Sequence, residues 1–562
     1  MLVHEGITDY RIVIAKDAGA AISHAADELA SYLMKITGAT FPIVTDDTEE
    51  TEKEILIGTT SRIGAENIPE LKEDGFIIER FGSKLLITGN GDRGVLYGVY
   101  GYLEALGCRF FAEDTETIPK LSDIRLGQVN HVKEEPAFFY RDLYWTCTYD
   151  PDFAVKSRIN GNIYSCGRKL DEAHGKGIDY AGSFCHTFYQ MVPPDKYFAS
   201  HPEYYSEKNG VRTCEHLYTQ LCLTNEDVLN IVIAEARKWL DANPGVPIIS
   251  ISQNDSFVFD SFCQCAKCTA INNEEGAHSG TLIRFVNQVA EALEESHPGI
   301  LVDTLAYQYS VGAPKITKPR ENVCVRYCTG VCAAHPIEEC SNAAGVAQNL
   351  REWGKICNKM YIWEYTTNFA HYLTPFPNFK TLQKNLQFFK ENGADGLFLQ
   401  GMYQDMSKSG EFGELRAYLL TRLAWDPYCD LEKAQNEFMR AYYGEGADEV
   451  EYFLDFIHTA IAKDNRHFNL ITAPKDLFNG LVSDADISTI DAIWARAKVE
   501  TNNDPKAQAH VRRSELCWRY YKMNAGRGEF AGNNSQATNQ FYADCNSMGV
   551  TKMNEGSNVP WV

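Results

Sequence analysis

The segment "VPIISISQND", residues 246–255, joins a short apolar run to a polar end. A short, Ile-rich run that follows Pro and Gly is typical of a strand buried in a parallel sheet. Its last two residues, Asn254 and Asp255, precede a loop with three close cysteines, "CQCAKC" at residues 263–268. The stretch therefore indicates the catalytic end of a strand, a metal-binding loop, or both in succession.

Seven further strand-like segments accompany this one, and several of them precede an amphipathic helical segment. The strand-like segments are residues 137–145, 161–167, 180–188, 301–309, 322–330, 359–369 and 396–403. The helical segments are residues 225–243, 279–299, 344–357, 379–395 and 413–425. Strands that alternate with helices in this way predict a (β/α)8 TIM barrel over residues 137–427.

The two flanks of this region follow other patterns. Residues 1–130 alternate strand-like and helix-like blocks, which predicts a small α/β domain. Within it, "GNGDRG" at residues 89–94 matches a dinucleotide-binding fingerprint, but the preceding strand reads as the return arm of a hairpin, so we expect a tight turn there. Residues 428–562 carry apolar residues at helical spacing and predict a helical C-terminal region, with Asp430 as an N-cap and Gly444 as a C-cap.

The charge balance limits the partners of the protein. A formal net charge of −23 over 562 residues argues against nucleic acid and anionic membranes. No apolar run approaches the ~20 residues that span a bilayer, so we expect no membrane insertion. The N-terminus lacks the basic start and apolar block of a secretory signal. We expect a cytoplasmic protein if this start is native, and a periplasmic or secreted one if a signal was removed; the oligomeric state is not predicted.

The carboxyl ends of the predicted strands should form the active site, as they do in barrel enzymes. Acidic residues end the fourth and seventh strands, at Asp255 and Glu364. The other strand ends are rich in aromatic and amide side chains, and the predicted substrate-binding residues are Trp145, His186, Tyr307, Tyr309, Trp363, Tyr365, Gln400 and Tyr403. Aromatic rings with few cations fit a carbohydrate better than a phosphate, which favours Lys, Arg or a Gly-rich loop.

Three kinds of chemistry are open to these residues. Two facing carboxylates hydrolyse a glycoside with retention at a separation of ~5 Å and with inversion at ~6.5–9.5 Å. Alternatively, a 2-acetamido group of the sugar supplies the nucleophile, while Asn254 orients that group and Asp255 protonates the leaving oxygen. The structural alternatives are a simple turn for Asn254 and Asp255 and a buried ion pair for Glu364. We favour catalysis.

The 17 cysteines are expected to be mostly buried, reduced thiols. A structural zinc ion on Cys263, Cys265 and Cys268 is the minor alternative, because tetrahedral zinc needs a fourth ligand. His278 or Cys324 would have to supply it, and neither has the usual spacing. We therefore expect no catalytic metal and no cofactor.

Several ordered motifs between about residues 140 and 445 resemble one protein family. They are "SQND…CQCAKC", "LIRFVNQVAEAL", "AYQYSVGAPK", "PRENVCVRYC", "YIWEYTTNF" and "GELRAYLLTRLAWDPYCD". Together they resemble a large bacterial domain-of-unknown-function family that includes glycoside hydrolase family 163, endo-β-N-acetylglucosaminidases that act on complex N-glycans. Residues 1–130 resemble the α/β domain that precedes the barrel in β-hexosaminidases and α-glucuronidases.

The resemblance implies a glycoside hydrolase that cleaves a β-N-acetylglucosaminide linkage, with retention and acetamido participation. It implies that Asn254 orients the acetamide, Asp255 is the acid/base and Glu364 is a second essential carboxylate. An exo-glycosidase of the α-glucuronidase or β-hexosaminidase type is the alternative enzyme; a uronate would need cations, for which Arg326, Arg168 and Arg141 are the candidates. A non-catalytic carbohydrate-binding barrel is the alternative outside the enzymes.

Overall fold

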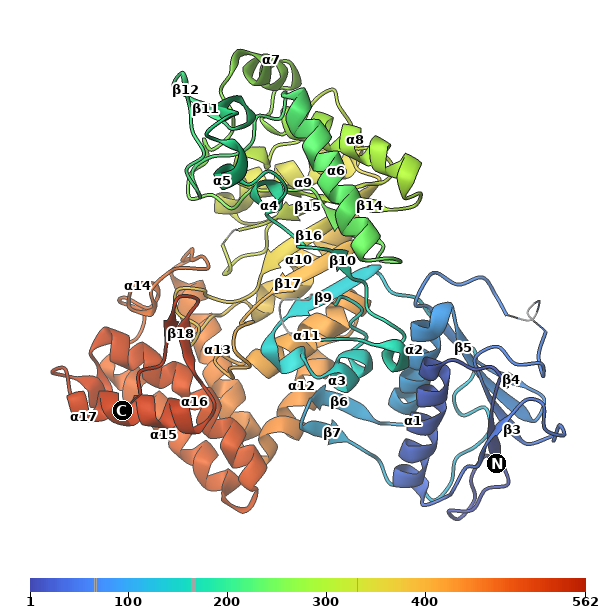
Figure 1. The fold of residues 1–562 in the computed structure, drawn as a ribbon. Coiled ribbons are helices and arrows are strands. Elements are labelled where there is room, and N and C mark those ends of the chain that lie inside the picture. The colour runs from blue at the N-terminus through green and yellow to red at the C-terminus, as the bar shows by residue number, and fades with distance from the viewer. Residues whose placement is uncertain (65, 67, 163–167, 331, 562) are drawn as a thin grey trace.

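The chain has three parts in sequence order, an N-terminal α/β part, a central parallel sheet with helices, and a helical C-terminal part (Figure 1). The computed structural model describes residues 1–64, 66, 68–162, 168–330 and 332–561. The N-terminal and C-terminal parts lie on either side of the lower end of the central sheet in the view of Figure 1.

The N-terminal part is built on a six-stranded mixed sheet with the order β2-β1-β3-β5-β4-β8. Its strands are β1 (Arg11–Ile14), β2 (Ile43–Thr45), β3 (Glu54–Ile57), β4 (Phe76–Phe81), β5 (Lys84–Gly89) and β8 (Val132–Glu134). Two helices, α1 (Ala20–Thr37) and α2 (Gly91–Ala105), pack against each other beside this sheet. The expected hairpin is confirmed, because β4 and β5 pair antiparallel.

The central sheet has seven strands in the order β10-β13-β14-β15-β16-β17-β9, and every neighbouring pair is parallel. The strands are β9 (Tyr140–Tyr144), β10 (Tyr180–Ala181), β13 (Ile248–Ser250), β14 (Leu301–Ala306), β15 (Val323–Cys328), β16 (Lys359–Tyr365) and β17 (Gly396–Gln400). The sheet is curled, and its first and last strands in chain order, β9 and β17, pair with each other as they do in a barrel, while β9 and β10 are its two edges.

One expected strand is not accounted for in this sheet. Most of the segment 161–167 falls on residues 163–167, which lie outside the described residues. Beside it, Gly161 forms an isolated parallel bridge with Ile178. The seven other segments each contain a strand of the parallel sheet, but within 180–188 only Tyr180–Ala181 is extended and Phe188 begins a helix. Full closure into an eight-stranded barrel stays a prediction.

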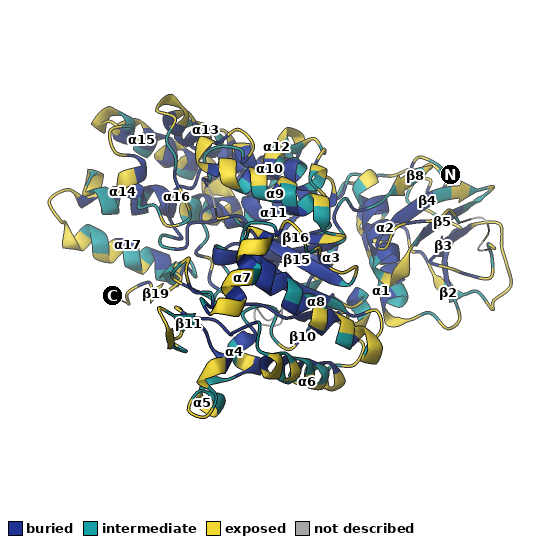
Figure 2. Cartoon of the chain, turned by 90° about the horizontal axis from the view of Figure 1, so that it is seen from above, coloured by how far each residue is buried: buried dark blue, intermediate teal, exposed yellow. Residues whose placement is uncertain are grey.

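The helices predicted between the strands are all present. They are α6 (Glu226–Ala242), α8 (Ser279–Ser296), α9 (Ala344–Ile356), α10 (Phe379–Glu391) and α11 (Gly413–Trp425). Figure 2 shows buried strands behind helices whose outer faces are exposed. Shorter elements are β6 (Arg109–Ala112), β7 (Thr115–Thr117), α3 (Pro151–Lys156), α4 (Phe188–Met191), α5 (Pro194–Tyr197), β11 (Glu207–Lys208), β12 (Val211–Arg212) and α7 (Ala266–Glu275).

The side chains of the central strands alternate between two cores, since successive residues of a strand point to opposite faces. Met360 and Ile362 of β16 join the core beneath the helices. Tyr361 and Trp363 of the same strand lie in clusters inside the curled sheet. This alternation decides which strand-end residues can reach a ligand.

The C-terminal part is helical, as predicted, but it ends in a hairpin. Its elements are α12 (Leu431–Tyr443), α13 (Ala447–Lys463), α14 (Pro474–Leu477), α15 (Asp484–Glu500), α16 (Pro505–Ala525), α17 (Ser535–Ser547), β18 (Lys552–Asn554) and β19 (Ser557–Asn558). The Asp430 side chain accepts a hydrogen bond from the Lys433 amide, and Gly444 ends α12, so both predicted caps are confirmed.

The terminal hairpin returns to the central sheet. The Tyr372 amide donates to the Met553 carbonyl, and the Glu555 amide donates to the Phe369 carbonyl. Both partners lie in the loop after β16. The hairpin therefore sits at the carboxyl end of the central strands.

Among the described residues, no helix combines the length and the apolar character needed to cross a membrane.

Candidate active site

A cavity of about 630 Å³ lies at the carboxyl ends of the central strands. Seven of the predicted site residues line it: His186, Asp255, Tyr307, Trp363, Tyr365, Gln400 and Tyr403. Residues that the sequence analysis did not select also line it, among them Tyr144, Phe184, Gln308, Thr329, Ile471 and Glu555. The cavity is therefore built from strand ends, from the loops after them, and from the C-terminal part.

Asp255 lines the cavity on the segment that continues from β13. Its Oδ1 accepts a hydrogen bond from the Tyr307 hydroxyl at 3.1 Å and another from the Ser256 amide at 2.8 Å. Both bonds use the same carboxylate oxygen. Oδ2 is therefore the oxygen that Asp255 can offer to a ligand.

His186 lies next to this group in the cavity wall. Its Nδ1 is 2.9 Å from the Gln253 carbonyl oxygen, which only accepts hydrogen bonds, so Nδ1 carries the proton. Burial lowers the pKa of His186 below its ordinary value, which favours the neutral ring. The second nitrogen, Nε2, is then an acceptor suited to a sugar hydroxyl.

Aromatic rings form most of the remaining wall. The Tyr144 and Tyr403 rings stack with their centroids 4.4 Å apart, and Phe184 lies against Trp363 at 5.8 Å. The Trp363 indole donates to Oε1 of Gln400 at 2.8 Å. These contacts hold the rings in fixed orientations.

Glu555 is the second carboxylate among the described residues that line the cavity, and it comes from the C-terminal hairpin. Its Oε1 accepts a hydrogen bond from the Tyr403 hydroxyl at 2.8 Å. The two residues are 152 positions apart in the chain. Glu555 was not predicted from the sequence, because no local pattern relates the C-terminal hairpin to a strand end.

Glu364 is not among the described residues that line this cavity, and its catalytic role stays a prediction. It follows Trp363 on β16 and therefore points to the opposite face of the sheet. Its Oε2 accepts a hydrogen bond from the Thr329 hydroxyl at 2.5 Å. It lines an adjoining space of about 10 Å³, together with Asn385 of α10, and this space shares Thr329, Tyr365 and Leu470 with the cavity.

The surroundings of Glu364 perturb its acidity. Burial raises the pKa of Glu364 to about 7, while hydrogen bonds from Thr329 and Asn385 act in the opposite direction. A shifted pKa is common at catalytic sites, but here the carboxyl group lies behind the cavity wall.

Three further predicted site residues lie outside the cavity. The side-chain amide of Asn254 accepts a hydrogen bond from the backbone N–H of Tyr189 at 3.0 Å and donates one to the Thr219 carbonyl at 3.3 Å. Asn254 therefore holds two loops together. Trp145 is 1% exposed, and its indole donates to the Thr366 hydroxyl. Tyr309 packs against Phe262.

The arginines considered for uronate binding are all buried and paired. Arg326 pairs with Asp303, Arg168 with Asp142, and Arg141 with Asp74. The described residues that line the cavity include neither Lys nor Arg. The described lining residues therefore offer no Lys or Arg side chain to the carboxylate of a uronate.

Comparison with known proteins gives two family matches. The family described as "Domain of unknown function (DUF4838)" matches residues 110–455. The "Glycosyl hydrolase family 67 N-terminus" matches residues 7–102. These matches do not address the narrower resemblance to glycoside hydrolase family 163.

One curated relative and two solved structures show how far the similarity extends. A "Probable alpha-glucuronidase A" of Aspergillus clavatus is 36% identical over 80 residues, which is 13% of this chain and 10% of that relative. A solved family GH115 4-O-methyl-alpha-glucuronidase "with specificity for decorated arabinogalactans" has a TM-score of 0.60 at 13% identity, over 96% of this chain and 76% of that one. A Streptomyces plicatus beta-hexosaminidase has a TM-score of 0.45 at 12% identity, over 77% of this chain and 91% of that one.

The likeness to the GH115 enzyme concerns the fold, and the curated relative is matched over only a tenth of its length. The match to residues 110–455 is of a different kind, because it spans more than half of the 562 residues. This chain belongs to the family described as "Domain of unknown function (DUF4838)".

Proposed function

We propose that this chain is a glycoside hydrolase that binds a neutral sugar in the cavity and uses Asp255 as its acid/base. The observation that carries the proposal is the place of Asp255, in the segment that follows the central strand β13, in an aromatic-lined cavity, held by Tyr307. Residues in this position of a parallel barrel are the usual carriers of catalysis. The glycosidase relationship of the N-terminal part supports the same reaction class.

A neutral sugar fits the lining better than a charged one. Tyr144, Trp363 and Tyr403 offer ring faces, while Gln308 and Gln400 offer amides for hydroxyl groups. A carboxylate in this space would meet Asp255 and Glu555 with no cation among the described lining residues. Burying such a charge without a partner is costly.

Within this class we propose a β-N-acetylglucosaminide linkage, cleaved with participation of the 2-acetamido group. The acetamide oxygen attacks the anomeric carbon while the glycosidic C–O bond breaks, and Asp255 protonates the leaving oxygen. Water then opens the cyclic intermediate and returns a proton to Asp255, with retention. Such a mechanism is one of the exceptions to the two-carboxylate rule and needs no protein nucleophile.

Glu555 takes the place that Glu364 was expected to hold. It and Asp255 belong to different walls of the cavity, since Asp255 is bound to Tyr307 beyond β14 and Glu555 to Tyr403 beyond β17. A carboxylate there can accept hydrogen bonds from sugar hydroxyls or from the acetamide N–H. We assign it to substrate orientation.

An α-glucuronidase is the second candidate, favoured by the similarity to the probable alpha-glucuronidase and by the GH115-like fold. It requires a cation for the uronate. Arg326 of β15 is 0% exposed and pairs with Asp303.

A substrate panel tests these assignments. Full-length protein is incubated with a complex N-glycan, an aryl β-N-acetylglucosaminide and an aryl α-glucuronide, beside the Asp255→Asn variant and the Glu364→Gln variant. We expect release from the first two substrates by wild type and Glu364→Gln, and none by Asp255→Asn. Glucuronide release would instead support the second candidate. Sugar binding without hydrolysis of any substrate would identify a carbohydrate-binding protein.

A further inference from the structure

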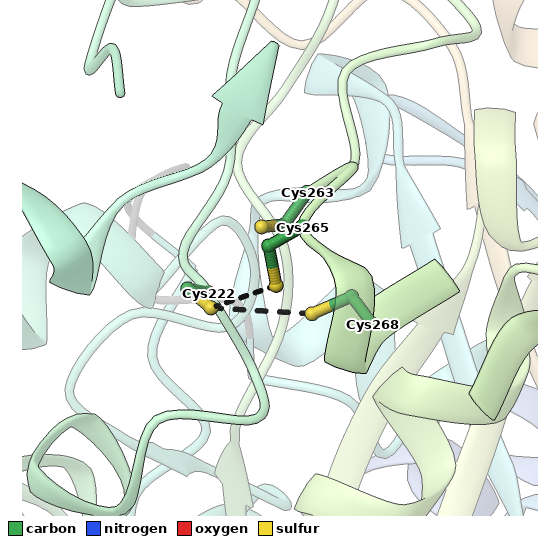
Figure 3. A group of neighbouring side chains, drawn as sticks. All are labelled: Cys222, Cys263, Cys265 and Cys268. Atoms are coloured by element: carbon green, nitrogen blue, oxygen red, sulfur yellow. Dashed lines mark hydrogen bonds between the residues drawn. The ribbon is translucent and has the colours of Figure 1, made fainter. Parts of the chain in front are cut away.

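Four cysteines from two distant loops converge on one buried point (Figure 3). They are Cys222, Cys263, Cys265 and Cys268, and all of their sulfur atoms lie within 4.8 Å of one another. The Cys222 sulfur is 3.8 Å from that of Cys265 and 3.9 Å from that of Cys268. These separations are far longer than the ~2.05 Å of a disulfide bond.

We propose that these four cysteines bind one structural zinc ion. A tetrahedral ion with Zn–S bonds of about 2.3 Å places its sulfur ligands about 3.8 Å apart, which is close to the two separations above. Four thiolates select a soft or borderline metal over magnesium or calcium. With four protein ligands the ion has no open position, so it takes no part in catalysis.

The fourth ligand differs from both sequence candidates. Cys222 precedes α6, 41 residues before Cys263. His278 instead stacks on Phe262, and Cys324 lies inside the curled sheet. Cys263, Cys265 and Cys268, the three ligands of the minor alternative, are close together in the chain, whereas Cys222 reaches the cluster through the tertiary structure.

The surroundings of the cluster suit negatively charged sulfur. The Glu207 amide donates to the Cys263 sulfur at 3.3 Å, and the Arg212 guanidinium donates to it at 3.5 Å. The Thr224 hydroxyl lies 3.3 Å from the Cys268 sulfur. Cys265 is the N-cap of α7, where the helix dipole favours negative charge. These groups offset the net charge of −2 that four thiolates and one Zn²⁺ carry.

The zinc ion joins the loop after Asp255 to the segment that precedes α6. The backbone already links the two at two points, where the Gln264 amide donates to the Glu207 carbonyl and the Phe257 amide donates to the Leu217 carbonyl. The same loop contributes Phe259 to the cavity. The ion thus stabilises a wall of the candidate active site from outside it.

A second cluster of four ligands carries an independent proposal. Cys332, His335, Cys340 and His467 place their ligand atoms within 4.8 Å of one another. The Cys332 sulfur is 3.4 Å from Nδ1 of His335, and the Cys340 sulfur is 3.4 Å from Nδ1 of His467. We propose a second structural zinc ion here, with two thiolates and two imidazoles as ligands.

The hydrogen bonding around His335 supports this second site. Its Nε2 donates to Oδ1 of Asn465 at 2.9 Å, so the lone pair is on Nδ1, which faces the cluster. The site joins the loop after β15 to the loop after α13, where Leu470 and Ile471 line the cavity. The two ions would therefore fasten two different walls of one cavity.

Metal analysis of the purified full-length protein tests both sites. We expect about two zinc ions per chain, about one in Cys222→Ser, and about one in Cys340→Ser. The Cys545→Ser variant is the matched control, because Cys545 is buried and outside both clusters, and it should keep two.

A second measurement covers variants that fail to fold. Wild-type protein purified from cells grown with cobalt in place of zinc should show the visible absorption bands of tetrahedral, thiolate-bound Co²⁺. If wild type holds one zinc per chain and only one of the two variants, Cys222→Ser or Cys340→Ser, loses it, the site of the other variant is overturned. A wild-type chain without zinc after growth in zinc-supplemented medium would overturn both, and iron with its visible absorption would overturn the assignment of the metal.

Discussion

The Tyr307 hydroxyl donates a hydrogen bond to Oδ1 of Asp255, with the two oxygens 3.1 Å apart. Tyr307 follows β14 and Asp255 lies beyond the neighbouring strand β13, so the bond joins two adjacent walls of the cavity. It fixes the carboxylate and leaves Oδ2 for the substrate.

Removing this bond should weaken catalysis without unfolding the protein. We expect Tyr307→Phe to lower kcat by about 10-fold, since a hydrogen bond to a charged group is worth about 1.5–3 kcal/mol and water replaces part of it. Steady-state kinetics and a thermal melt measure the two effects. Tyr309→Phe is the matched control, because Tyr309 does not line the cavity. An equal fall in both variants would contradict the role of Tyr307.

Glu555 should affect substrate binding more than the chemical step. We expect Glu555→Gln to raise KM by about 10-fold, the cost of about one charged hydrogen bond to the sugar, with a smaller change in kcat. Tyr403→Phe, which removes the partner of Glu555, should act in the same direction. A fall in kcat of several hundredfold in Glu555→Gln with unchanged KM would instead make Glu555 a catalytic group.

Glu364 should make stability depend on pH. Burial raises its pKa from 4.5 to about 7, so the folded protein holds this proton more tightly than the unfolded chain. The stabilisation of the folded protein that comes from protonated Glu364 is therefore complete below pH 4.5 and is lost as the pH rises through 7. We expect Glu364→Gln to be more stable than wild type at pH 8, by up to about 3 kcal/mol, and to match it near pH 4.

Denaturant unfolding of both proteins at several pH values measures this difference. Asp17→Asn, at an exposed side chain, gives the background pH response of a carboxylate-to-amide change. If Glu364→Gln is less stable than wild type at pH 8, a neighbouring group stabilises the ionised carboxylate of Glu364, and the prediction is contradicted.

The buried pair of Arg326 and Asp303 should be essential to stability. Both side chains are 0% exposed, and the pair is 3.1 Å long. Asp303→Asn leaves a buried guanidinium without its carboxylate, so we expect a loss of about 3–5 kcal/mol in unfolding free energy. Asp47→Asn, which breaks the exposed pair of Lys16 and Asp47, should lower the unfolding free energy by under about 1 kcal/mol. Equal losses in the two variants would show that the interior solvates Arg326 by other means.

The sequence predicted the strands of the central sheet well, because each is a short apolar run between turn residues. It was less reliable about where side chains point. Alternation along β16 places Trp363 and Tyr365 on the cavity side and Glu364 on the other, and this signal was present in the sequence. The same one-residue shift separates Tyr144, which lines the cavity, from Trp145, which does not.

Other parts of the site depend on contacts that no local pattern contains. β13 ends at Ser250, so the chain from there to Asn254 and Asp255 is irregular and the strand period no longer applies. Glu555 and Cys222 are brought to their sites by folding alone. The residue types were informative for chemistry, and the topology was needed to select among them.

The dependence of rate on the leaving group tests the role of Asp255 most directly. Wild type and Asp255→Asn are compared on aryl β-N-acetylglucosaminides, one with a dinitrophenyl leaving group that needs no proton and one with a methoxyphenyl group that does. If Asp255 is the acid, the variant should lose about 100–10,000-fold on the methoxyphenyl substrate and far less on the dinitrophenyl substrate. Wild-type rates on both substrates, or an equal loss on both, would contradict this assignment.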